Sequence, residues 1–272
     1  MRLPSIFTSK RLGIDLGTSN CLVWASGEGV VLSEPSVVAV EADTGRVVAV
    51  GSQAHEMLGK VGAESYLLAQ KPLKEGVIAD YLVSEAMLKY FLDKVLGGAR
   101  FARPEVMVCV PTGISQVERR AVLEAALSAG ARTAYLIDQP MAAAIGAKLP
   151  VDAAVGSMIV DIGGGQVQAA VVSLGGIVTS ASAKIGGAKL DEAIIVYVRR
   201  NHNLIIGERM AEEIKIKVGS AMPVSPKREI EVKGRDAISG LPRTLTIDAN
   251  EITEAMQPVI GGIINTIKTV LE

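Results

Sequence analysis

One pattern occurs twice, 146 positions apart, as Leu12-Gly-Ile-Asp-Leu-Gly-Thr-Ser-Asn-Cys-Leu-Val-Trp24 and as Met158-Ile-Val-Asp-Ile-Gly-Gly-Gly-Gln-Val-Gln-Ala-Ala170. In each copy an apolar run predicts a buried strand that ends at an aspartate, Asp15 or Asp161. Glycines follow where the backbone must approach a ligand closely, and successive N–H groups there can bind phosphate oxygens. The repeat therefore predicts two phosphate-binding hairpins that hold one nucleotide between two domains.

The remainder of each copy supports this interpretation. Each continues into a second apolar strand, at residues 21–25 and 169–174, and then turns at glycine. Either copy alone is equally consistent with an ordinary tight turn, but two copies at one offset argue against that alternative. Carboxylates that face each other across a polyphosphate would hold Mg²⁺ mostly through water, which is how this hard cation prefers to bind.

Composition favours a cytosolic α/β protein and excludes other classes. A length of 272 residues is enough for two lobes. The net charge of −1 gives no electrostatic footprint for nucleic acid, so none is expected as a partner. Cys21 and Cys109 lie in apolar runs and are expected to be reduced core residues. Charged residues interrupt every run that could span a bilayer, and the first ten residues lack the apolar core of a secretory signal.

Strand and helix signals alternate along the chain, as in folds with covered mixed or parallel sheets. Residues 37–40 and 47–50 flank a turn and predict a hairpin. Further strands are predicted at residues 106–110, 135–137, 228–233 and 244–247, and helices at 84–95, 115–129 (with Ser115 as N-cap), 141–147, 191–201 and 208–218. Residues 250–271 predict a helix that breaks near Pro258. His55 and His202 lack partners spaced for a metal or a nucleophile and are expected at the surface.

Several further motifs follow one another in a characteristic order. They are Glu34-Pro-Ser-Val-Val-Ala39, Pro72-Leu-Lys-Glu-Gly-Val-Ile-Ala-Asp80, Glu85-Ala-Met-Leu-Lys-Tyr-Phe91, Val117-Glu-Arg-Arg-Ala-Val122, Pro140-Met-Ala-Ala-Ala-Ile-Gly146, Ser173-Leu-Gly-Gly-Ile-Val-Thr-Ser180 and Ile206-Gly-Glu-Arg209. With the first hairpin, this series resembles the actin and Hsp70 ATPase superfamily and, within it, the MreB family of bacterial actins. It covers nearly the whole chain and is far more specific than one glycine loop.

The resemblance implies an actin-like ATPase fold of two ribonuclease-H-like lobes with small inserted subdomains. These would be subdomain IA (1–32 and 67–144), IB (33–66), IIA (145–181 and 243–272, its C-terminal part missing) and IIB (182–242). It also implies that ATP and Mg²⁺ lie in the interlobe cleft, where Asp15 and Asp161 organise Mg²⁺ and Gln139 orients a water. The other implied nucleotide-binding residues are Gly17, Thr18, Ser19 and Asn20 at the β-phosphate, Gly163, Gly164 and Gly165 at the γ-phosphate, Gly186 and Gly187 beside these phosphates, and Glu212 and Lys215 at the ribose. Read alone, without the resemblance, Glu212 and Lys215 are more typical of a solvated helix pair than of a ribose site.

The phosphate site departs from the MreB-like pattern at three points. Gln139 stands where relatives have glutamate, Gln166-Val167-Gln168 where they have Thr-Thr-Glu, and Ala188-Lys189 where acidic residues are usual. A glutamine cannot act as a general base, but it can hold a water by hydrogen bonds. Nucleotide binding is therefore expected. Hydrolysis is left open between a slow ATPase and a non-hydrolysing scaffold or degenerate, truncated paralogue.

The resemblance extends to the cellular role. It implies head-to-tail filaments of the chain itself, which organise the cell-wall elongation machinery of rod-shaped cells at the inner face of the membrane. Ile6 and Phe7 near basic residues, and Phe101 between arginines, would suit an anionic lipid interface. The alternative is a disordered terminus and a loop whose phenylalanine folds inward. Family members continue beyond the position of Glu272, so the second lobe is expected to expose apolar surface.

Overall fold

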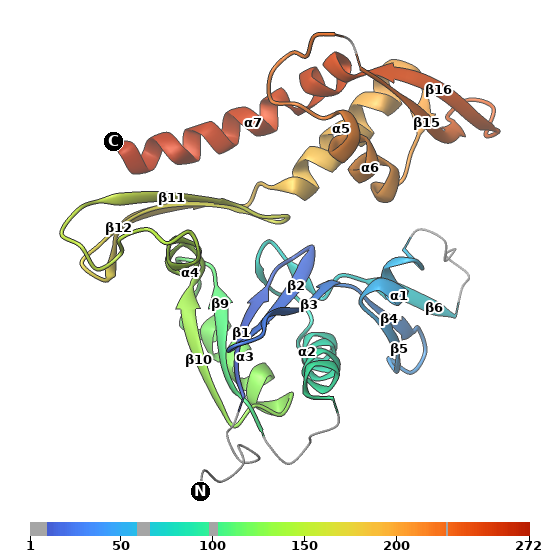
Figure 1. Cartoon of the computed structure of the whole chain (residues 1–272). Coiled ribbons are helices and arrows are strands. Elements are labelled where there is room, and N and C mark those ends of the chain that lie inside the picture. The colour runs from blue at the N-terminus through green and yellow to red at the C-terminus, as the bar shows by residue number, and fades with distance from the viewer. Residues whose placement is uncertain (1–9, 59–65, 98–102, 227) are drawn as a thin grey trace, which may run out of the picture.

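The two repeated segments fold as two β-hairpins with the same register (Figure 1). The structure, a computed structural model, describes residues 10–58, 66–97, 103–226 and 228–272. In the first hairpin Asp15 is paired with Leu22, and in the second Asp161 is paired with Gln168. Both pairs follow the 146-residue offset of the sequence. The predicted internal repeat is thus confirmed in the backbone pairing.

The first hairpin belongs to a five-stranded sheet with the order β10-β9-β1-β2-β3. Its strands are β1 (Arg11–Leu16), β2 (Asn20–Ala25), β3 (Gly29–Pro35), β9 (Glu105–Val110) and β10 (Thr133–Asp138). β1, β9 and β10 run parallel, whereas β1, β2 and β3 are antiparallel neighbours. Strands that run parallel end at the same edge of a sheet, so the residues after β1, β9 and β10 are brought together.

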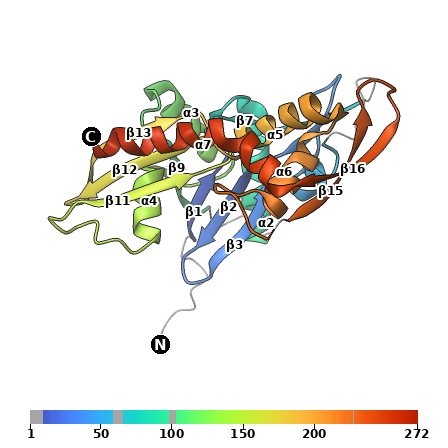
Figure 2. The same cartoon turned by 90° about the horizontal axis from the view of Figure 1, so that it is seen from above.

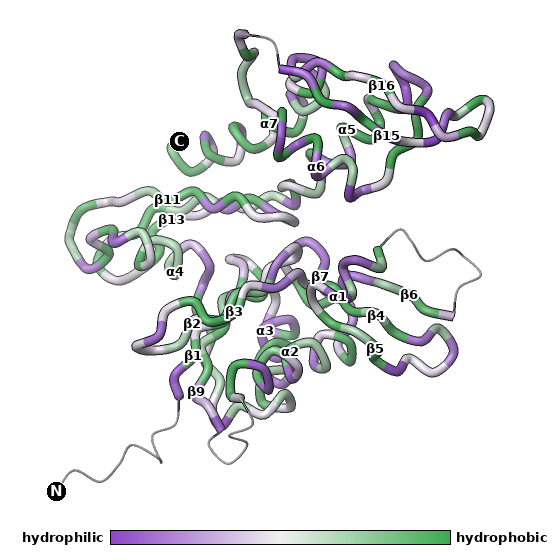
Figure 3. Tube along the Cα trace, turned by 45° about the vertical axis from the view of Figure 1, so that its right-hand side comes forward, coloured by the Kyte–Doolittle hydropathy of each residue, from purple (hydrophilic) through white to green (hydrophobic). Residues whose placement is uncertain are grey.

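Helices α2 (Tyr81–Leu96) and α3 (Gln116–Ser128) pack together and contribute buried residues to the same core as this sheet. Ile14, Val23 and Val108 are fully buried in this core, and hydrophobic residues follow the strands in Figure 3. The predicted start of α3 is confirmed, because Ser115 and Glu118 form a reciprocal capping box. We call residues 10–138 the first lobe.

Small strands extend this lobe on one side. They are β4 (Val38–Glu41), β5 (Val47–Val50), β6 (Leu67–Gln70), β7 (Leu73–Lys74) and β8 (Val77–Ile78), with the short helix α1 (Ser52–His55). β4 and β5 pair as the predicted antiparallel hairpin, and β4 also pairs with β6. β7 and β8 form a two-stranded ribbon whose turn contains Glu75 and Gly76, both at positive φ. This turn lies against the second hairpin, since a Cβ on Gly165 would lie 3.1 Å from Cα of Glu75.

The second hairpin continues into a three-stranded antiparallel sheet of β11 (Ser157–Ile162), β12 (Val167–Ser173) and β13 (Gly176–Ala183). Helices α4 (Gln139–Gly146) and α7 (Ala249–Leu271) contact this sheet from opposite sides, as Figures 1 and 2 show. We call residues 157–272 the second lobe, and α4 lies between the two lobes. The fold is therefore two sheets, each begun by one copy of the repeat.

The rest of the second lobe forms its own hydrophobic core. Its elements are α5 (Gly187–His202), β14 (Leu204–Ile205), α6 (Glu208–Val218), β15 (Glu229–Asp236) and β16 (Pro242–Asp248). β15 and β16 pair antiparallel as predicted, and α6 has the predicted bounds. Buried side chains from α5, α6, β15 and α7 meet in this core, which fixes α5 and α6 beside the second hairpin.

One prediction for this lobe is wrong. The break expected near Pro258 does not occur, since α7 is one continuous helix with Pro258 inside it. Its apolar side packs on β12 and β13, and its start is fixed by a capping box between Asp248 and Glu251, which together outweigh the lost backbone hydrogen bond. His202, which was predicted at the surface, is partly exposed and makes one contact that the sequence did not indicate. Its Nε2 lies 2.8 Å from Oε2 of Glu251, so it links α5 to α7.

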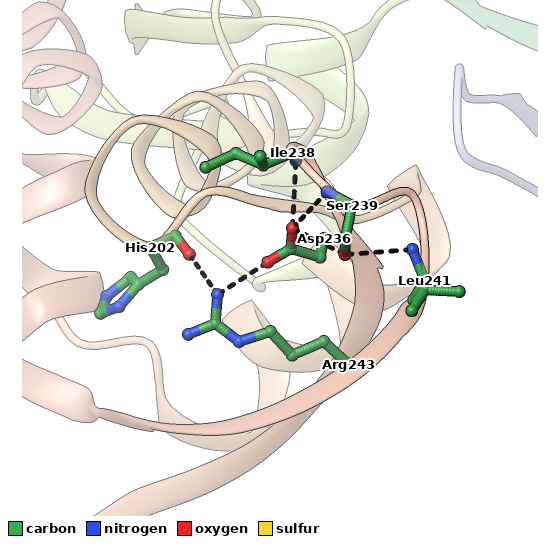
Figure 4. Close-up of polar contacts among 6 residues, drawn as sticks. All are labelled: His202, Asp236, Ile238, Ser239, Leu241 and Arg243. Atoms are coloured by element: carbon green, nitrogen blue, oxygen red, sulfur yellow. Dashed lines mark hydrogen bonds and ion pairs between the residues drawn. The ribbon is translucent and has the colours of Figure 1, made fainter.

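The turn between β15 and β16 is closed by Asp236 (Figure 4). Its Oδ1 accepts hydrogen bonds from the backbone N–H of Ile238 and Ser239, at 3.0 and 2.9 Å. Its Oδ2 accepts one from Nη1 of Arg243 at 3.0 Å, and the same nitrogen donates to the carbonyl oxygen of His202. These bonds lower the pKa of Asp236 to about 2, the backbone donors most. One carboxylate therefore ties the turn to the end of α5.

Candidate functional site

Three polar residues meet where the parallel strands of the first lobe end. Asp15 lies near the end of β1, Thr112 follows β9 and Gln139 follows β10. Asp161, near the end of β11, lines the same groove as Asp15 and Gln139. Sequence predicted the two aspartates and Gln139 at one site, and the structure brings them together. It adds Thr112, which the sequence analysis missed.

The turns of the two hairpins are in direct contact. A Cβ on Gly164 would overlap the hydroxyl of Ser19, and one on Gly165 would lie 2.5 Å from Oγ1 of Thr18. Gly17 also has no room for a side chain, because a Cβ there would lie 2.6 Å from the carbonyl oxygen of Asn20. Gly17, Gly164 and Gly165 therefore stand where an added Cβ would clash, and the last two let the turns of the two hairpins approach each other closely.

Gly186 and Gly187 join the second hairpin to the start of α5. A Cβ on Gly186 would overlap the carbonyl oxygen of Gly163, so this approach is open only to glycine. The N–H groups of Gly187 and Ala188 donate to the carbonyl oxygens of Gly163 and Gly164, at 3.0 and 2.8 Å. The first turn of α5 is thus held against the glycine turn, and its N-terminus favours negative charge there.

The two aspartates are held in an environment that disfavours two negative charges. Burial raises the pKa of Asp15, and the hydrogen bond from Gln139 offsets part of that rise. Burial raises the pKa of Asp161, and the negative charge of Asp15 raises it further. A cation placed between them would relieve both effects.

A hydrogen-bonded chain of glutamines crosses the site. Nε2 of Gln139 donates to Oδ1 of Asp15 at 3.3 Å, and Oε1 of Gln139 accepts from Nε2 of both Gln166 and Gln168, at 3.0 and 2.5 Å. Oε1 of Gln168 in turn accepts from the backbone N–H and the hydroxyl of Thr112, at 2.8 and 3.0 Å. The second lobe is thereby tied to Gln139 and to the first lobe by neutral groups.

Lys215 of α6 reaches toward the second hairpin. Its Nζ lies 2.8 Å from Oδ1 of Asp191 in α5 and donates to the carbonyl oxygen of Gly187 at 3.1 Å. Burial raises the pKa of Asp191, and Lys215 offsets part of the rise. Asp191 was missed by the sequence analysis, and Lys215 has this carboxylate rather than bulk solvent as its neighbour. Glu212 lies one helical turn earlier on α6 and is partly buried.

Contacts across the cleft surround the β7–β8 turn. Within the first lobe, the N–H of Gly76 donates to Oγ1 of Thr18 at 2.9 Å and holds the turn beside the first hairpin. The contacts to the second lobe are ion pairs. Nζ of Lys184, just after β13, lies 2.9 Å from Oε2 of Glu75. A second, exposed ion pair joins Lys71 to Glu208 at 3.2 Å. Because these partners are far apart in the sequence, only tertiary structure reveals that the turn links the lobes.

A groove of about 930 Å³ runs from the aspartates along the uncovered face of the first-lobe sheet. Asp15, Asp161 and Gln139 lie along it together with apolar side chains that include Trp24, Met107 and Tyr135. Exposed apolar side chains occur in both lobes, for example Val117 in the first and Val178 in the second. The first-lobe face was not expected to be open.

The predicted membrane contacts concern three residues of two stretches. Ile6, Phe7 and Phe101, the candidate lipid contacts, lie outside the described residues. Within residues 10–58, 66–97, 103–226 and 228–272, no helix combines the length and apolarity needed to cross a bilayer. The same part of the chain contains no cluster of three or more His, Cys, Asp or Glu side chains suited to a metal ion. Cys21 and Cys109 are free thiols.

Known proteins resemble this chain over almost its whole length. A family model described as MreB/Mbl protein matches residues 9–272. The cell shape-determining protein MreB of Escherichia coli is 52% identical over 270 residues, which are 97% of this chain and 77% of that protein. MreB5 of Spiroplasma citri, solved bound to ADP, superposes with a TM-score of 0.90 at 32% identity over 97% of this chain and 79% of that one. A MamK double helical filament has the same fold, with a TM-score of 0.80 at 23% identity.

Proposed function

This chain belongs to the MreB/Mbl family, and on that premise we propose that it binds Mg-ATP in the cleft between its two hairpins. The observation that carries the proposal is the pair of hairpins in equal register, with Asp15 and Asp161 on one groove and glycines where the turns touch. The relative MreB5 has been solved with ADP and with AMPPNP, which supports the same ligand class here.

Each predicted residue has a role that its position permits. Residues 17–20 would bind the β-phosphate through backbone N–H groups, and residues 163–165 the γ-phosphate. Gly186 and Gly187, at the start of α5, would border the same phosphates. Glu212 and Lys215 on one side of α6 would reach the ribose, and Asp191 would orient Lys215 by its ion pair.

Asp15 and Asp161 fit a Mg²⁺ ion that is held largely by water and phosphate oxygens. Two carboxylates with raised pKa values are favourable neighbours for a divalent cation. The described residues contain no group of three or more protein ligands that could hold a metal ion without water or phosphate. Bound Mg²⁺ would neutralise phosphate charge. The protein's part would be to hold both carboxylates and to keep the phosphates against the glycine turns.

The family name and the relatives' names support a role in cell shape. We propose that the nucleotide-bound chain forms head-to-tail filaments at the inner face of the membrane and organises wall synthesis there. A flotation assay with anionic vesicles tests the membrane part, comparing the full chain with the triple variant Ile6→Ser, Phe7→Ser, Phe101→Ser. Loss of flotation in the variant alone would support it, and a full chain that stays with the soluble fraction would contradict it.

Hydrolysis has two candidate outcomes, a slow ATPase and a non-hydrolysing scaffold. The glutamine chain favours the scaffold, because both hydrogen bonds accepted by Oε1 of Gln139 come from protein groups. Release of inorganic phosphate by nucleotide-saturated protein discriminates between them. A flat signal supports the scaffold, and a steady release that an Asp161→Ala variant lacks supports the ATPase.

A further inference from the structure

The hydrogen-bonded chain from Thr112 to Asp15 has a fixed polarity. The backbone N–H of Thr112 can only donate, so the atom of Gln168 that lies 2.8 Å from it must be the oxygen. The amide nitrogen of Gln168 then faces Gln139 and donates to its oxygen. The amide nitrogen of Gln139 is left facing Asp15, whose ionised carboxylate can only accept. Both ends therefore enforce the same direction.

This polarity determines what Gln139 can offer to a water molecule. An amide oxygen accepts through two lone pairs, and those of Gln139 are used by Gln166 and Gln168. A water that attacks a phosphate keeps a lone pair toward phosphorus and gives its protons to acceptors. Gln139 has only an N–H left for such a water. An N–H donates, whereas the protons of the attacking water need an acceptor.

Gln168 holds this arrangement most firmly. Its side chain is 1% exposed, and in the first copy of the repeat the equivalent position is the apolar Leu22. A buried amide that turned around would put its N–H₂ against the N–H of Thr112 and leave polar atoms unpaired, which is costly. The amide of Gln168 therefore has one stable orientation.

We propose that Gln168 is a positioning residue that keeps the oxygen of Gln139 away from water, so that a nucleoside triphosphate bound in the cleft stays unhydrolysed. This inference rests on the proposed nucleotide binding. It assigns to Gln168 the suppression of turnover rather than the binding of nucleotide.

Two substitutions separate that role from a structural one. Gln168→Glu keeps the size of the side chain and its bonds from Thr112, but the ionised carboxylate cannot donate to Gln139. Gln168→Met removes donor and acceptor without adding charge. Gln257→Glu makes the same chemical change at an exposed position of α7 and serves as the control. The readouts are the dissociation constant of ATP with Mg²⁺, by calorimetry, and single-turnover phosphate release.

Both Gln168 variants are expected to release phosphate about fivefold faster or more, the rate equivalent of one hydrogen bond. Their ATP affinity should stay within about threefold of the original chain. The control should match the original chain in both measurements. Unchanged release in both variants, or a fall in release and affinity together, would overturn the inference. If Gln168→Met does not fold, as judged by circular dichroism, Gln168→Glu decides alone. An original chain that binds no ATP would instead overturn the proposed function, and the inference with it.

Discussion

Asp15 and Asp161 occupy the same position in two hairpins, and the charge of Asp15 adds to burial in raising the pKa of Asp161. In the folded chain the pKa of each aspartate is therefore higher than in the unfolded chain, where it is near the ordinary value of 3.8. This unfavourable pair of carboxylates is the observation on which the proposed Mg²⁺ site rests.

Asp161→Asn should therefore stabilise the chain when Mg²⁺ and nucleotide are absent. A raised folded pKa costs stability above that pKa and costs nothing below the unfolded value, so the gain should be present at pH 7 and shrink as the pH falls toward 4. Solvent screening keeps it under about 1 kcal/mol. Thermal unfolding between pH 4 and 8 measures it, and a variant that melts below the original chain at pH 7 would refute this reasoning.

The same substitution should reverse its effect when Mg-ATP is added. A ligand that binds only the folded state raises the melting temperature of the protein. Mg-ATP should therefore raise the melting temperature of the original chain and change that of the variant little. Equal gains in the two proteins would show that Asp161 does not contribute to the ligand site.

Asp236→Asn should lower the melting temperature by loosening the β15–β16 turn. The folded pKa of Asp236 is depressed from 3.8 to about 2. Its stabilising contribution is therefore complete above about pH 4 and lost as the pH falls toward 2. The difference in melting temperature between the two proteins should follow that course. Asp152→Asn, at an exposed turn, is the control for the loss of one surface carboxyl group.

Gly261→Ala should raise the stability of the chain by about 0.5–1 kcal/mol, since alanine is the better helix former. Apart from its chain neighbours and the backbone of its own helix, a Cβ added to Gly261 inside α7 would meet no described atom within 4 Å. Gly262→Ala should gain less, because its Cβ would lie 2.8 Å from Cδ1 of Ile185. Urea unfolding of the two variants checks the order, and a loss of stability in Gly261→Ala would show that α7 is not the regular helix described.

Lys184→Glu should weaken nucleotide binding about two- to fivefold by replacing an attraction across the cleft with a repulsion. The double variant with Glu75→Lys should recover most of that loss, since it restores an opposite pair. Fluorescent ATP titration at low and high salt measures both proteins. If the single variant binds as well as the original chain, the ion pair does not help to close the cleft.

The sequence was most informative where structure depends on neighbouring residues. The strand, aspartate and glycine order predicted both hairpins, and Ser115 with Glu118 predicted the start of α3. The site residues that the sequence analysis did not predict depend on tertiary contacts. Thr112 and Asp191 become site residues only after strands and helices from distant segments converge, although a polar residue just after a parallel strand is a signal that could have found Thr112.

Long-range packing also explains the helix that was predicted to break. The propensity of Pro258 argues for a break in α7, but it is outweighed by the contact of the helix with β12 and β13, which the local sequence does not show. The polarity of the glutamine chain is a similar case, since it depends on one backbone N–H from another lobe.

Calorimetric titration of the chain with ATP and Mg²⁺, beside an Asp161→Ala variant, tests the central claim most directly. Asp152→Ala is the matched control, because it removes an exposed aspartate. We predict one nucleotide bound per original chain, equal binding by the control, and binding about tenfold weaker or lost in Asp161→Ala. Binding that is absent from the original chain, or that is equal in all three proteins, would contradict a nucleotide site between the two hairpins.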